Sequence, residues 1–495
     1  MFLLFLSSLV ILSSICFWTH QKPHKFPPGP KWLPIVGCMF KFQELKNKFG
    51  YMYIAINELS QKYGSILGLK LGCQKFVIIS GNDLLRKTLM KPEFQGRPDG
   101  FFFQVRAFGK RRGILFADGP LWYQSKRNTI KYISHIGFRH RLVDKYLTEE
   151  AETLVCYLKK KITNNKEKIA MNKIFDVAVL NSLWVLLAGY RFDYDDVRLH
   201  NILTTIHEAF ESNDTLGGLI SHFPFLRFII PEISGYTSLM KTLHKLWKFI
   251  DDEIEIHLNK IQLHQPASNF IDAYLLERYD ETSRQFSYDR KELIVICLDL
   301  FLAGSKTTID SLSGIFALLV HHPDWIKLLK DDLDMVVGNN MPKIDHIPML
   351  PRIEAFLIEA LRVLVLAPLA LPHRTTENVW LEGFHIPKDT VILFNFHSAN
   401  FDESCWENAE EFYPQRFLNK SGQFCRKIEF FPFGLGRRRC LGESLAKSSI
   451  FLFFTHILHN FNLEIPEGEK LPQLDGIDGF TISPRPYFLH LTPRI

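Results

Sequence analysis

Apolar residues recur along most of this chain at every third or fourth position. This spacing gives a helix one apolar face, and it predicts helices over residues 51–63, 142–161, 174–187, 237–257, 289–321, 352–366 and 443–458. The alternating pattern of a strand appears only in short runs. These runs predict one hairpin from residues 66–71 and 75–80, and a second strand pair from residues 379–385 and 391–396. The expected fold class is mainly α with a minor β region.

The first eighteen residues carry no charge. As a helix they would be about 27 Å long, close to the thickness of the hydrocarbon core of a bilayer. The basic residues Lys22, Lys25 and Lys31 follow this run instead of preceding it, which favours an uncleaved anchor over a cleaved signal peptide. We therefore expect residues 1–21 to be an N-terminal transmembrane anchor with the body of the protein in the cytosol, and a signal peptide is the alternative.

Prolines follow the apolar run, because residues 26–30 read Phe-Pro-Pro-Gly-Pro. Such a segment cannot continue a helix and has little flexibility, so residues 22–37 are predicted to form a stiff, proline-rich joint. Beyond Gly37 the sequence contains no second linker, internal repeat or low-complexity segment. Residues 38–495 are therefore expected to form a single large domain.

Composition narrows the class of protein. The chain is 46% hydrophobic and 23% charged, which is typical of a globular protein. A net charge of +6 over 495 residues is too weak to indicate nucleic-acid binding, and we expect no nucleic-acid partner. The 8 cysteines form no CxxC pair, which favours a reducing compartment over a disulfide framework or a zinc site. The 43 phenylalanines predict a large apolar interior.

The chemistry concentrates in residues 433–442, which read Phe-Gly-Leu-Gly-Arg-Arg-Arg-Cys-Leu-Gly. Glycines allow close approach of the backbone to a bulky group. The arginines, and a helix predicted to begin after Gly442, should lower the pKa of the Cys440 thiol and favour a thiolate that binds a metal or acts as a nucleophile. A basic, glycine-rich surface loop with an incidental cysteine is the alternative.

This segment resembles the haem-thiolate signature of the cytochrome P-450 family, F-x-x-G-x-R-x-C-x-G, which is matched by Phe433, Gly436, Arg438, Cys440 and Gly442. The proline-rich joint, the Glu-Ala-Leu-Arg of residues 359–362 and the Phe-Tyr-Pro-Gln-Arg-Phe of residues 412–417 follow the family's order. The resemblance implies a cytochrome P-450 type helical domain that binds haem b (iron protoporphyrin IX), with Cys440 as the axial ligand of the iron.

The resemblance also implies how the haem is held. It implies that Glu359, Arg362 and Arg416 form a buried ionic triad, whereas an E-x-x-R on a helix is otherwise most often a surface ion pair. The residues that it nominates to bind the haem propionates are Arg438, His373, Arg97 and, through its indole N–H, Trp122. In the family's W-x-x-x-R pattern, Lys126 stands where the arginine is expected, and either Lys126 or Arg127 could make that contact.

Residues 303–308 read Ala-Gly-Ser-Lys-Thr-Thr and are similar to the family's oxygen-activation motif, A-G-x-(D/E)-T-T. The similarity implies that Ala303 and Gly304 leave room for dioxygen and that the Thr307 hydroxyl positions a water that supplies protons. A hydroxyl that merely bonds back to its own helix is the alternative. Lys306 replaces the usual acid, and this inverted charge is expected to slow or reroute proton delivery.

The implied activity is a monooxygenase that inserts one oxygen atom from O2 into a hydrophobic small molecule, by hydroxylation or epoxidation. The chain has no flavin-binding segment and no G-x-G-x-x-G in a strand-turn-helix context, so we expect its electrons to come from a separate NADPH-dependent flavoprotein reductase. Residues 420–447 contain seven basic and two acidic residues and are expected to dock that partner. The resemblance implies a microsomal enzyme on the cytosolic face of the endoplasmic reticulum membrane.

The substrate is less well defined. The candidate pocket walls, each of which could equally be core, are Phe101, Leu300, Ala367, Leu371 and Phe480. Residues 223–230 are apolar enough to dip into the bilayer surface. Residues 93–103 resemble insect microsomal members of the family, which include epoxidases of juvenile-hormone precursors and detoxifying enzymes. This resemblance favours a juvenoid hormone precursor as the substrate, and a lipid or a xenobiotic is the alternative. A peroxide isomerase or dehydratase of the same fold, and a haem-binding carrier or sensor without turnover, are the alternative functions.

Overall fold

A computed structural model gives the fold, and it describes residues 21–135, 141–162, 168–212, 215–263, 265–280, 285–286 and 288–494. The anchor expected over residues 1–21 lies outside these ranges, apart from its last residue. Within the ranges described, none of the helices is both long and apolar enough to cross a bilayer.

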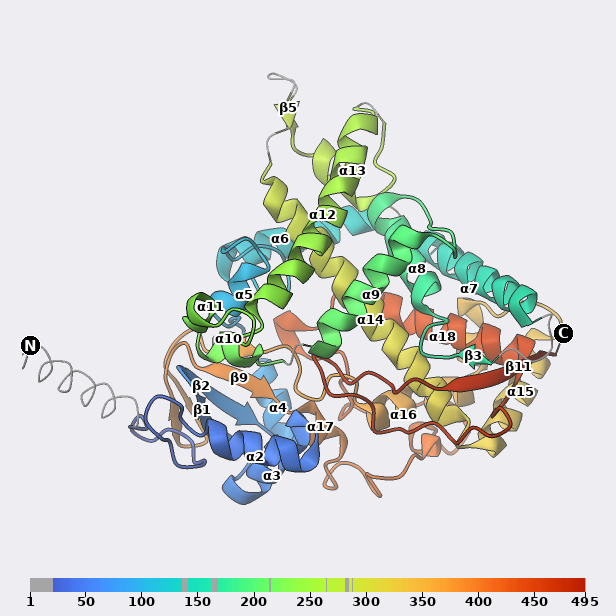
Figure 1. The fold of residues 1–495 in the computed structure, drawn as a ribbon. Helices are drawn as coiled ribbons and strands as arrows, with labels where there is room; N and C mark the ends of the chain where they lie inside the picture. Colours follow the sequence, from blue (N-terminus) through green and yellow to red (C-terminus); the bar gives the residue numbers. More distant parts are fainter. Residues whose placement is uncertain are drawn as a thin grey trace, which may run out of the picture.

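Helices dominate the structure, with 53% of residues in helix and 10% in strand, which confirms the expected fold class (Figure 1). The long helices are α6 (Gly119–His135), α7 (Arg141–Lys161), α8 (Asp176–Ala188), α9 (Val197–Ser212), α12 (Tyr236–Lys260), α14 (Arg290–Leu319), α15 (Pro323–Val337), α16 (Pro351–Leu364) and α18 (Glu443–Asn460). The shorter ones are α2 (Met39–Phe49), α3 (Met52–Tyr63), α4 (Asn82–Leu89), α5 (Phe101–Val105), α10 (Gly218–His222), α11 (Leu226–Ile229), α13 (Phe270–Leu276) and α17 (Phe396–Asn400). Every helix that the apolar spacing predicts is present, with ends within a few residues of the prediction.

The larger sheet has the strand order β1-β2-β9-β6, formed by β1 (Ile66–Leu71), β2 (Gln74–Ile79), β9 (Val391–Phe394) and β6 (His373–Arg374). Strands β1 and β2 form the predicted hairpin. The second predicted pair is wrong, because β9 runs parallel to β2, whereas β7 (Val379–Leu381) pairs with β8 (Phe384–Ile386). Glu382 and Gly383 both have positive φ, at 46° and 82°, and this two-residue turn folds the predicted single strand into a hairpin.

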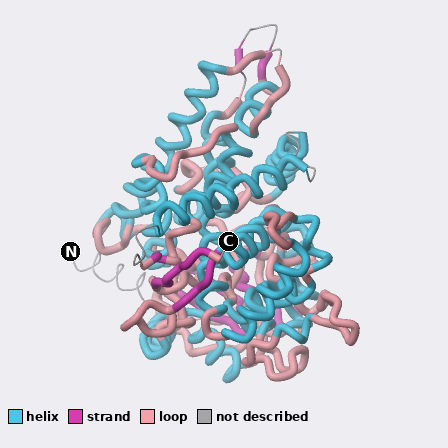
Figure 2. The backbone as a smooth tube through the Cα atoms, turned by 90° about the vertical axis from the view of Figure 1, so that its right-hand side faces the viewer, coloured by secondary structure: helices cyan, strands magenta, loops and turns pink. Residues whose placement is uncertain are grey.

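A smaller sheet lies near the C-terminus and has the order β10-β11-β3, from β10 (Phe461–Glu464), β11 (Phe488–Pro493) and β3 (Ile169–Ala170). A short hairpin of β4 (Tyr279–Asp280) and β5 (Gln285–Phe286) projects beyond α13. Helix α14 crosses the middle of the molecule and packs against α8, α12, α16 and α18 (Figure 1). It is buried along nearly its whole length, as expected of a helix that is apolar on most sides. Figure 2 shows that helices make up most of the chain and that strands are short.

The proline-rich segment lies directly on the larger sheet. The N–H of Gly68, in β1, donates to the carbonyl of Pro28 at 2.7 Å, and Phe26 and Trp32 are buried with their rings 5.5 Å apart. A Cβ at Gly29 would lie 2.0 Å from the carbonyl oxygen of Gly68, so only glycine permits this approach. The segment therefore has a fixed place on the domain.

Candidate functional site

The cysteine loop is built by a backbone turn immediately before α18. The N–H of Cys440 donates to the carbonyl of Phe433 at 2.8 Å, which closes the loop around Gly434 and Gly436. Gly436 has φ +68°, and a Cβ there would lie 2.5 Å from the carbonyl oxygen of Leu89 at the end of α4. The glycine thus lets the loop pack tightly on α4.

The Cys440 side chain is exposed by area, yet the protein around it is close enough that burial raises the pKa of its thiol. A hydrogen bond from the Gly442 backbone and the charge of Arg439 lower this pKa but do not overcome burial. The expectation that the pKa of the Cys440 thiol is lowered is therefore wrong for the protein without a metal. Burial is the largest cause, and the charge of Glu443 adds to it. The three arginines of the loop also have partners of their own: Arg437 donates to the Tyr123 hydroxyl, Arg438 to backbone carbonyls and Arg439 to the Glu443 carboxylate.

Two arginines lie beside this loop: Arg97 is buried and Arg438 is half-buried, and the charge of Asp118 acts on both. Within the described part of the chain neither Arg97 nor Arg438 forms an ion pair, and Nε of Arg97 and Nη1 of Arg438 are buried without a hydrogen-bond partner. Burial lowers the pKa of both guanidinium groups, to about 10 for Arg438, and the charge of Arg438 lowers that of Arg97 further. Two such positive charges at one place favour a ligand with two negative groups.

The other two residues nominated for the propionates, His373 and Trp122, have partners within the protein. Burial lowers the pKa of His373 well below its ordinary value, and its Nδ1 lies 2.7 Å from the Phe94 carbonyl. Its contact with a propionate stays a prediction. The indole N–H of Trp122 donates to the Ile114 carbonyl at 3.1 Å, and its role as a propionate donor stays a prediction. Trp122 also presents its ring to the guanidinium of Arg438, 3.6 Å away.

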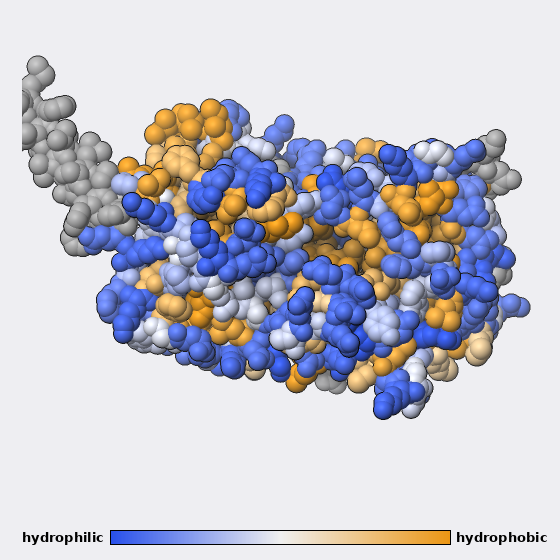
Figure 3. Space-filling model, turned by 90° about the horizontal axis from the view of Figure 1, so that it is seen from below, coloured by the Kyte–Doolittle hydropathy of each residue, from blue (hydrophilic) through white to orange (hydrophobic). Residues whose placement is uncertain are grey.

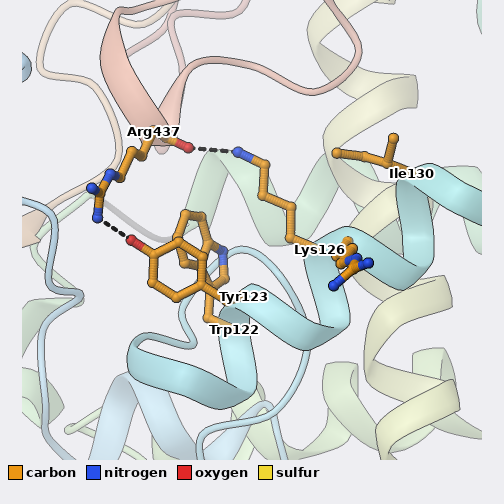
Figure 4. Close-up of a pocket in the computed structure, with 6 residues that line it drawn as sticks. Trp122, Tyr123, Lys126, Ile130 and Arg437 are labelled. Carbon is orange, nitrogen blue, oxygen red and sulfur yellow. Dashed lines mark hydrogen bonds between the residues drawn. The ribbon is translucent and has the colours of Figure 1, made fainter.

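Lys126 and Arg127, the two candidates for the contact of the W-x-x-x-R pattern, differ in their surroundings. Lys126 donates to the carbonyl of Arg437 at 2.5 Å and lies over the Trp122 ring, whereas Arg127 is exposed. Both line a shallow surface hollow of about 710 Å³ on α6, together with Tyr123 and Ile130 (Figure 4). The primary amine therefore fastens α6 to the cysteine loop.

The candidate oxygen-binding residues share one face of α14. Leu300, Ala303, Gly304 and Thr307 are partly exposed while most of the helix is buried, and their spacing places them on one side. The Thr307 hydroxyl donates to the carbonyl of Ala303 at 2.7 Å, which is the back-bonded alternative. A Cβ at Gly304 would lie 2.9 Å from Leu183 of α8, so this glycine also serves close helix packing.

Lys306 does not belong to that face. Its ammonium is buried and lies 2.6 Å from the Asp310 carboxylate, one turn further along α14, and 2.8 Å from the Ser483 hydroxyl. The positive charge that replaces the family's acid is therefore neutralised inside the domain by Asp310.

The predicted triad residues meet in one buried network. Glu359 and Arg362 are fully buried and form two hydrogen bonds, at 2.8 and 2.9 Å, and Arg416 adds a third contact with Glu359 at 3.0 Å. Arg362 also donates to the carbonyls of Asn400 and Ala409, at 2.7 Å each. The network ties α16 to the segment that precedes the cysteine loop.

The five candidate pocket residues are less closely grouped. Phe101 lies under the guanidinium of Arg227, 4.0 Å from its ring centre, and near Tyr236, so the contacts observed for its ring are with α11 and α12. Leu371 is partly buried, and its carbonyl accepts from Arg97 at 3.0 Å. Leu300 is on the accessible face of α14, Ala367 is exposed, and Phe480 packs edge-on against Phe210 of α9.

Sequence reasoning missed Asp118, which organises the residues around Arg97. Asp118 accepts from the N–H of Arg97 and from the side chains of Arg374 and Arg111. Burial alone would raise its pKa, but the hydrogen bonds from Arg374 and Arg97 lower it. A single aspartate in a loop gives no signal in the sequence, because its partners are distributed between residues 97 and 374.

Comparisons with known proteins agree with this geometry. A sequence model of the family described as Cytochrome P450 matches residues 27–491. Similar proteins include the Farnesoate epoxidase of Bombyx mori, 34% identical over 99% of both chains, and the Probable cytochrome P450 303a1 of Drosophila melanogaster, 33% identical over 98% of this chain and 97% of the relative. Cytochrome P450 2D6 of Homo sapiens is 29% identical over 95% of this chain and 94% of the relative.

The helical fold and its cysteine loop therefore define a haem-thiolate monooxygenase, an enzyme that uses haem, O2 and electrons from a reductase. The chain belongs to the cytochrome P450 family. The residues present fit a haem, because the thiol is accessible inside the domain and the two guanidinium groups lack the anions that propionates would supply.

Proposed function

We propose that this monooxygenase acts on a farnesoate-type substrate, a long apolar chain that ends in an acid or ester, and epoxidises or hydroxylates it. The single observation that supports this substrate is the end-to-end similarity, at 34% identity, to a protein named Farnesoate epoxidase. The apolar residues on the accessible face of α14 suit such a chain. A detoxifying enzyme with another lipophilic substrate is the competing assignment.

In this proposal Cys440 ligates the iron, and Arg97 and Arg438 bind the propionates through their unpartnered N–H groups. Haem with a thiolate ligand supplies the chemistry that cleaves O2 and oxidises an unactivated carbon. Thr307 turns its hydroxyl from the Ala303 carbonyl to a water and so relays protons on the accessible face of α14. Phe433 and Gly436 shape the loop that carries Cys440, and Glu359, Arg362 and Arg416 hold that loop's support in place.

The internal neutralisation of Lys306 favours an oxygenase over a peroxide isomerase or dehydratase. Lys306 pairs with Asp310 away from the accessible face, so the ammonium does not add a positive charge next to Thr307. Proton delivery is then left to Thr307 and water.

We infer that an NADPH-dependent flavoprotein reductase docks beside the cysteine loop. Arg127 and Arg437 line the hollow on α6, where Figure 4 shows Arg437. Arg439 lies in the cysteine loop and is 52% exposed. Opposite charges steer the encounter of redox partners. Arg127→Glu should weaken reduction by the reductase and reduce its salt dependence, while chemical reduction by dithionite stays unchanged.

We infer that the domain attaches to a membrane through the end of the molecule at which the described chain begins. Phe225, Phe228, Ile229 and Ile233 are 51–77% exposed near α11, and apolar side chains gather at this end of the molecule (Figure 3). Together with an anchor over residues 1–21, this surface would place the domain on the cytosolic face of the endoplasmic reticulum. Phe228→Ser with Ile229→Ser should reduce vesicle binding of a protein that lacks residues 1–21.

The proposal is tested by assaying the full-length protein with a cytochrome P450 reductase, NADPH and methyl farnesoate. We expect an epoxide or alcohol whose formation requires NADPH, together with a thiolate-type Soret band in the reduced, carbon monoxide-bound protein. The same assay with farnesoic acid, ecdysteroids, fatty acids and xenobiotics provides the comparison. A normal Soret band with turnover of another substrate class, and none of the farnesoates, would refute the substrate proposal.

A further inference from the structure

A closed polar cluster joins α14 to the C-terminal part of the chain. Lys306 and Asp310 are 2% and 4% exposed, and their ion pair is capped by Ser483. The Ser483 hydroxyl accepts from the ammonium of Lys306 at 2.8 Å and donates to the second oxygen of Asp310 at 2.9 Å. A buried ion pair is stable only while its remaining polar atoms are satisfied. Ser483 is therefore part of the site that keeps the two charges away from water.

Ser483 ends a short loop, residues 477–483, which we call the C-terminal loop. Its two ends are joined by backbone hydrogen bonds between Ile477 and Ser483, at 2.7 and 3.1 Å. The tip is bound to α9, because the N–H of Phe480 donates to the carbonyl of Phe210 at 2.8 Å. The N–H of Ile482 donates to the carbonyl of Leu366, also at 2.8 Å. The loop thus joins three segments that are far apart in the sequence.

These contacts connect the buried ion pair to the candidate substrate pocket. Leu366 immediately precedes Ala367, and the loop carries Phe480, so two candidate pocket positions are adjacent to the loop's hydrogen bonds. Thr307, the next residue after Lys306, is on the accessible face of α14. The same two turns of α14 therefore present a reactive face on one side and hold the C-terminal loop on another.

We propose that Lys306 is a positioning residue: with Asp310 it clamps the C-terminal loop to α14 and so fixes Phe480 in the substrate pocket. The argument rests on the proposed pocket. It does not depend on the identity of the substrate. Replacing Lys306 with an apolar residue leaves the Asp310 carboxylate buried without its counter-ion, and that charge is relieved most simply by admitting water beneath the loop. The loop then loses its fixed position while the face that carries Thr307 is retained.

The test uses the holoenzyme and two haem ligands of different size. Imidazole needs little room, whereas 4-phenylimidazole must also place its phenyl ring in the pocket, and both dissociation constants are measured from the Soret shift. We expect Lys306→Met to speed amide hydrogen exchange in residues 477–483 and to weaken 4-phenylimidazole binding about tenfold, because residues in one network are strongly coupled. Imidazole binding should stay unchanged.

Further variants separate this role from a general loss of stability. Ser483→Ala keeps the ion pair and removes both hydrogen bonds to it, so it should give the same two effects more weakly. It provides the test if Lys306→Met does not fold. The double variant Lys306→Met with Asp310→Leu removes both charges and both hydrogen bonds to Ser483, so it should regain the part of the 4-phenylimidazole affinity lost to the unpaired charge and bind about as Ser483→Ala does. Lys248→Met breaks an exposed Lys-Asp pair of the same spacing on α12 and is the matched control, with no expected effect.

Unchanged exchange in residues 477–483 in both Lys306→Met and Ser483→Ala would overturn the clamp. Faster exchange with unchanged 4-phenylimidazole affinity would overturn the positioning role. A changed solvent isotope effect on turnover with unchanged ligand affinity would assign Lys306 to proton delivery instead, and would also overturn it. Failure of methyl farnesoate as a substrate appears only in the product assay and leaves these measurements valid.

Discussion

Replacing Glu359 with glutamine should strongly destabilise the domain. The carboxylate of Glu359 is fully buried and accepts hydrogen bonds from Arg362 at 2.8 and 2.9 Å, from Arg416 at 3.0 Å and from the backbone of Tyr413 at 2.9 Å. Three of these bonds go to one oxygen, so an amide keeps at most one accepting oxygen and turns its NH2 group toward a guanidinium. Because Arg362 is then a buried charge without a counter-ion, we expect a loss of about 3–5 kcal/mol.

The loss can be measured as the shift in the urea midpoint, followed by the Soret band of the carbon monoxide complex. The chain supplies a matched control, because Lys41 and Glu44 form an ion pair with the same three-residue spacing, at 2.7 Å, on the exposed surface of α2. Glu44→Gln should cost no more than about 0.5 kcal/mol. If Glu359→Gln shifts the midpoint no further than Glu44→Gln does, the argument from a buried charge is wrong.

Three other substitutions have defined outcomes. Burial alone would lower the pKa of His257, but the hydrogen bonds that its ring donates to the carboxylates of Asp272 and Glu253 raise this pKa to about 9. The stabilising contribution of the charged ring is therefore complete below about pH 6.5 and is lost as the pH rises through 9. The unfolding free energy of the wild type should therefore fall over this range by up to about 3 kcal/mol relative to His257→Gln in urea titrations. Arg97→Met should stabilise the haem-free protein, because it removes a buried charge, and yet speed haem transfer to apomyoglobin about tenfold. Thr307→Ala should lower product formed per NADPH about tenfold and increase hydrogen peroxide release, with an unchanged Soret band.

Local signals in the sequence were sufficient for the helices and insufficient for the second strand pair. The apolar spacing of residues 289–321 predicts α14 well, because a long helix repeats its signal over many turns. The run from residue 379 failed because Glu382 adopts a positive φ, which a glutamate rarely does and which the alternating pattern does not reveal. Tertiary contacts decide such a turn.

The candidate site, like the fold, is predictable where its signal is local in the sequence and unpredictable where tertiary contacts decide. The cysteine loop is predictable because its residues are contiguous and their spacing is fixed. The orientation of each arginine is not, since Arg438 turns toward backbone carbonyls and Arg439 toward Glu443. The pKa of the Cys440 thiol is raised mainly by burial, which the local sequence does not reveal. Lys306 shows this most clearly. Its counter-ion Asp310 is one helical turn away, but the hydroxyl that completes the cluster belongs to Ser483, which is far away in the sequence.

Buried charges in this domain therefore differ in whether the protein itself neutralises them. Arg362 has Glu359, and Lys306 has Asp310, so both are structural charges that need no ligand. In the part of the chain that the structure describes, Arg97 and Arg438 have no such partner, and burial lowers the pKa of each. Their charge is compatible with a stable interior only if an anion enters from outside the chain. This difference in pairing, which sequence motifs do not display, distinguishes the arginines suited to a cofactor from the charges that hold the fold.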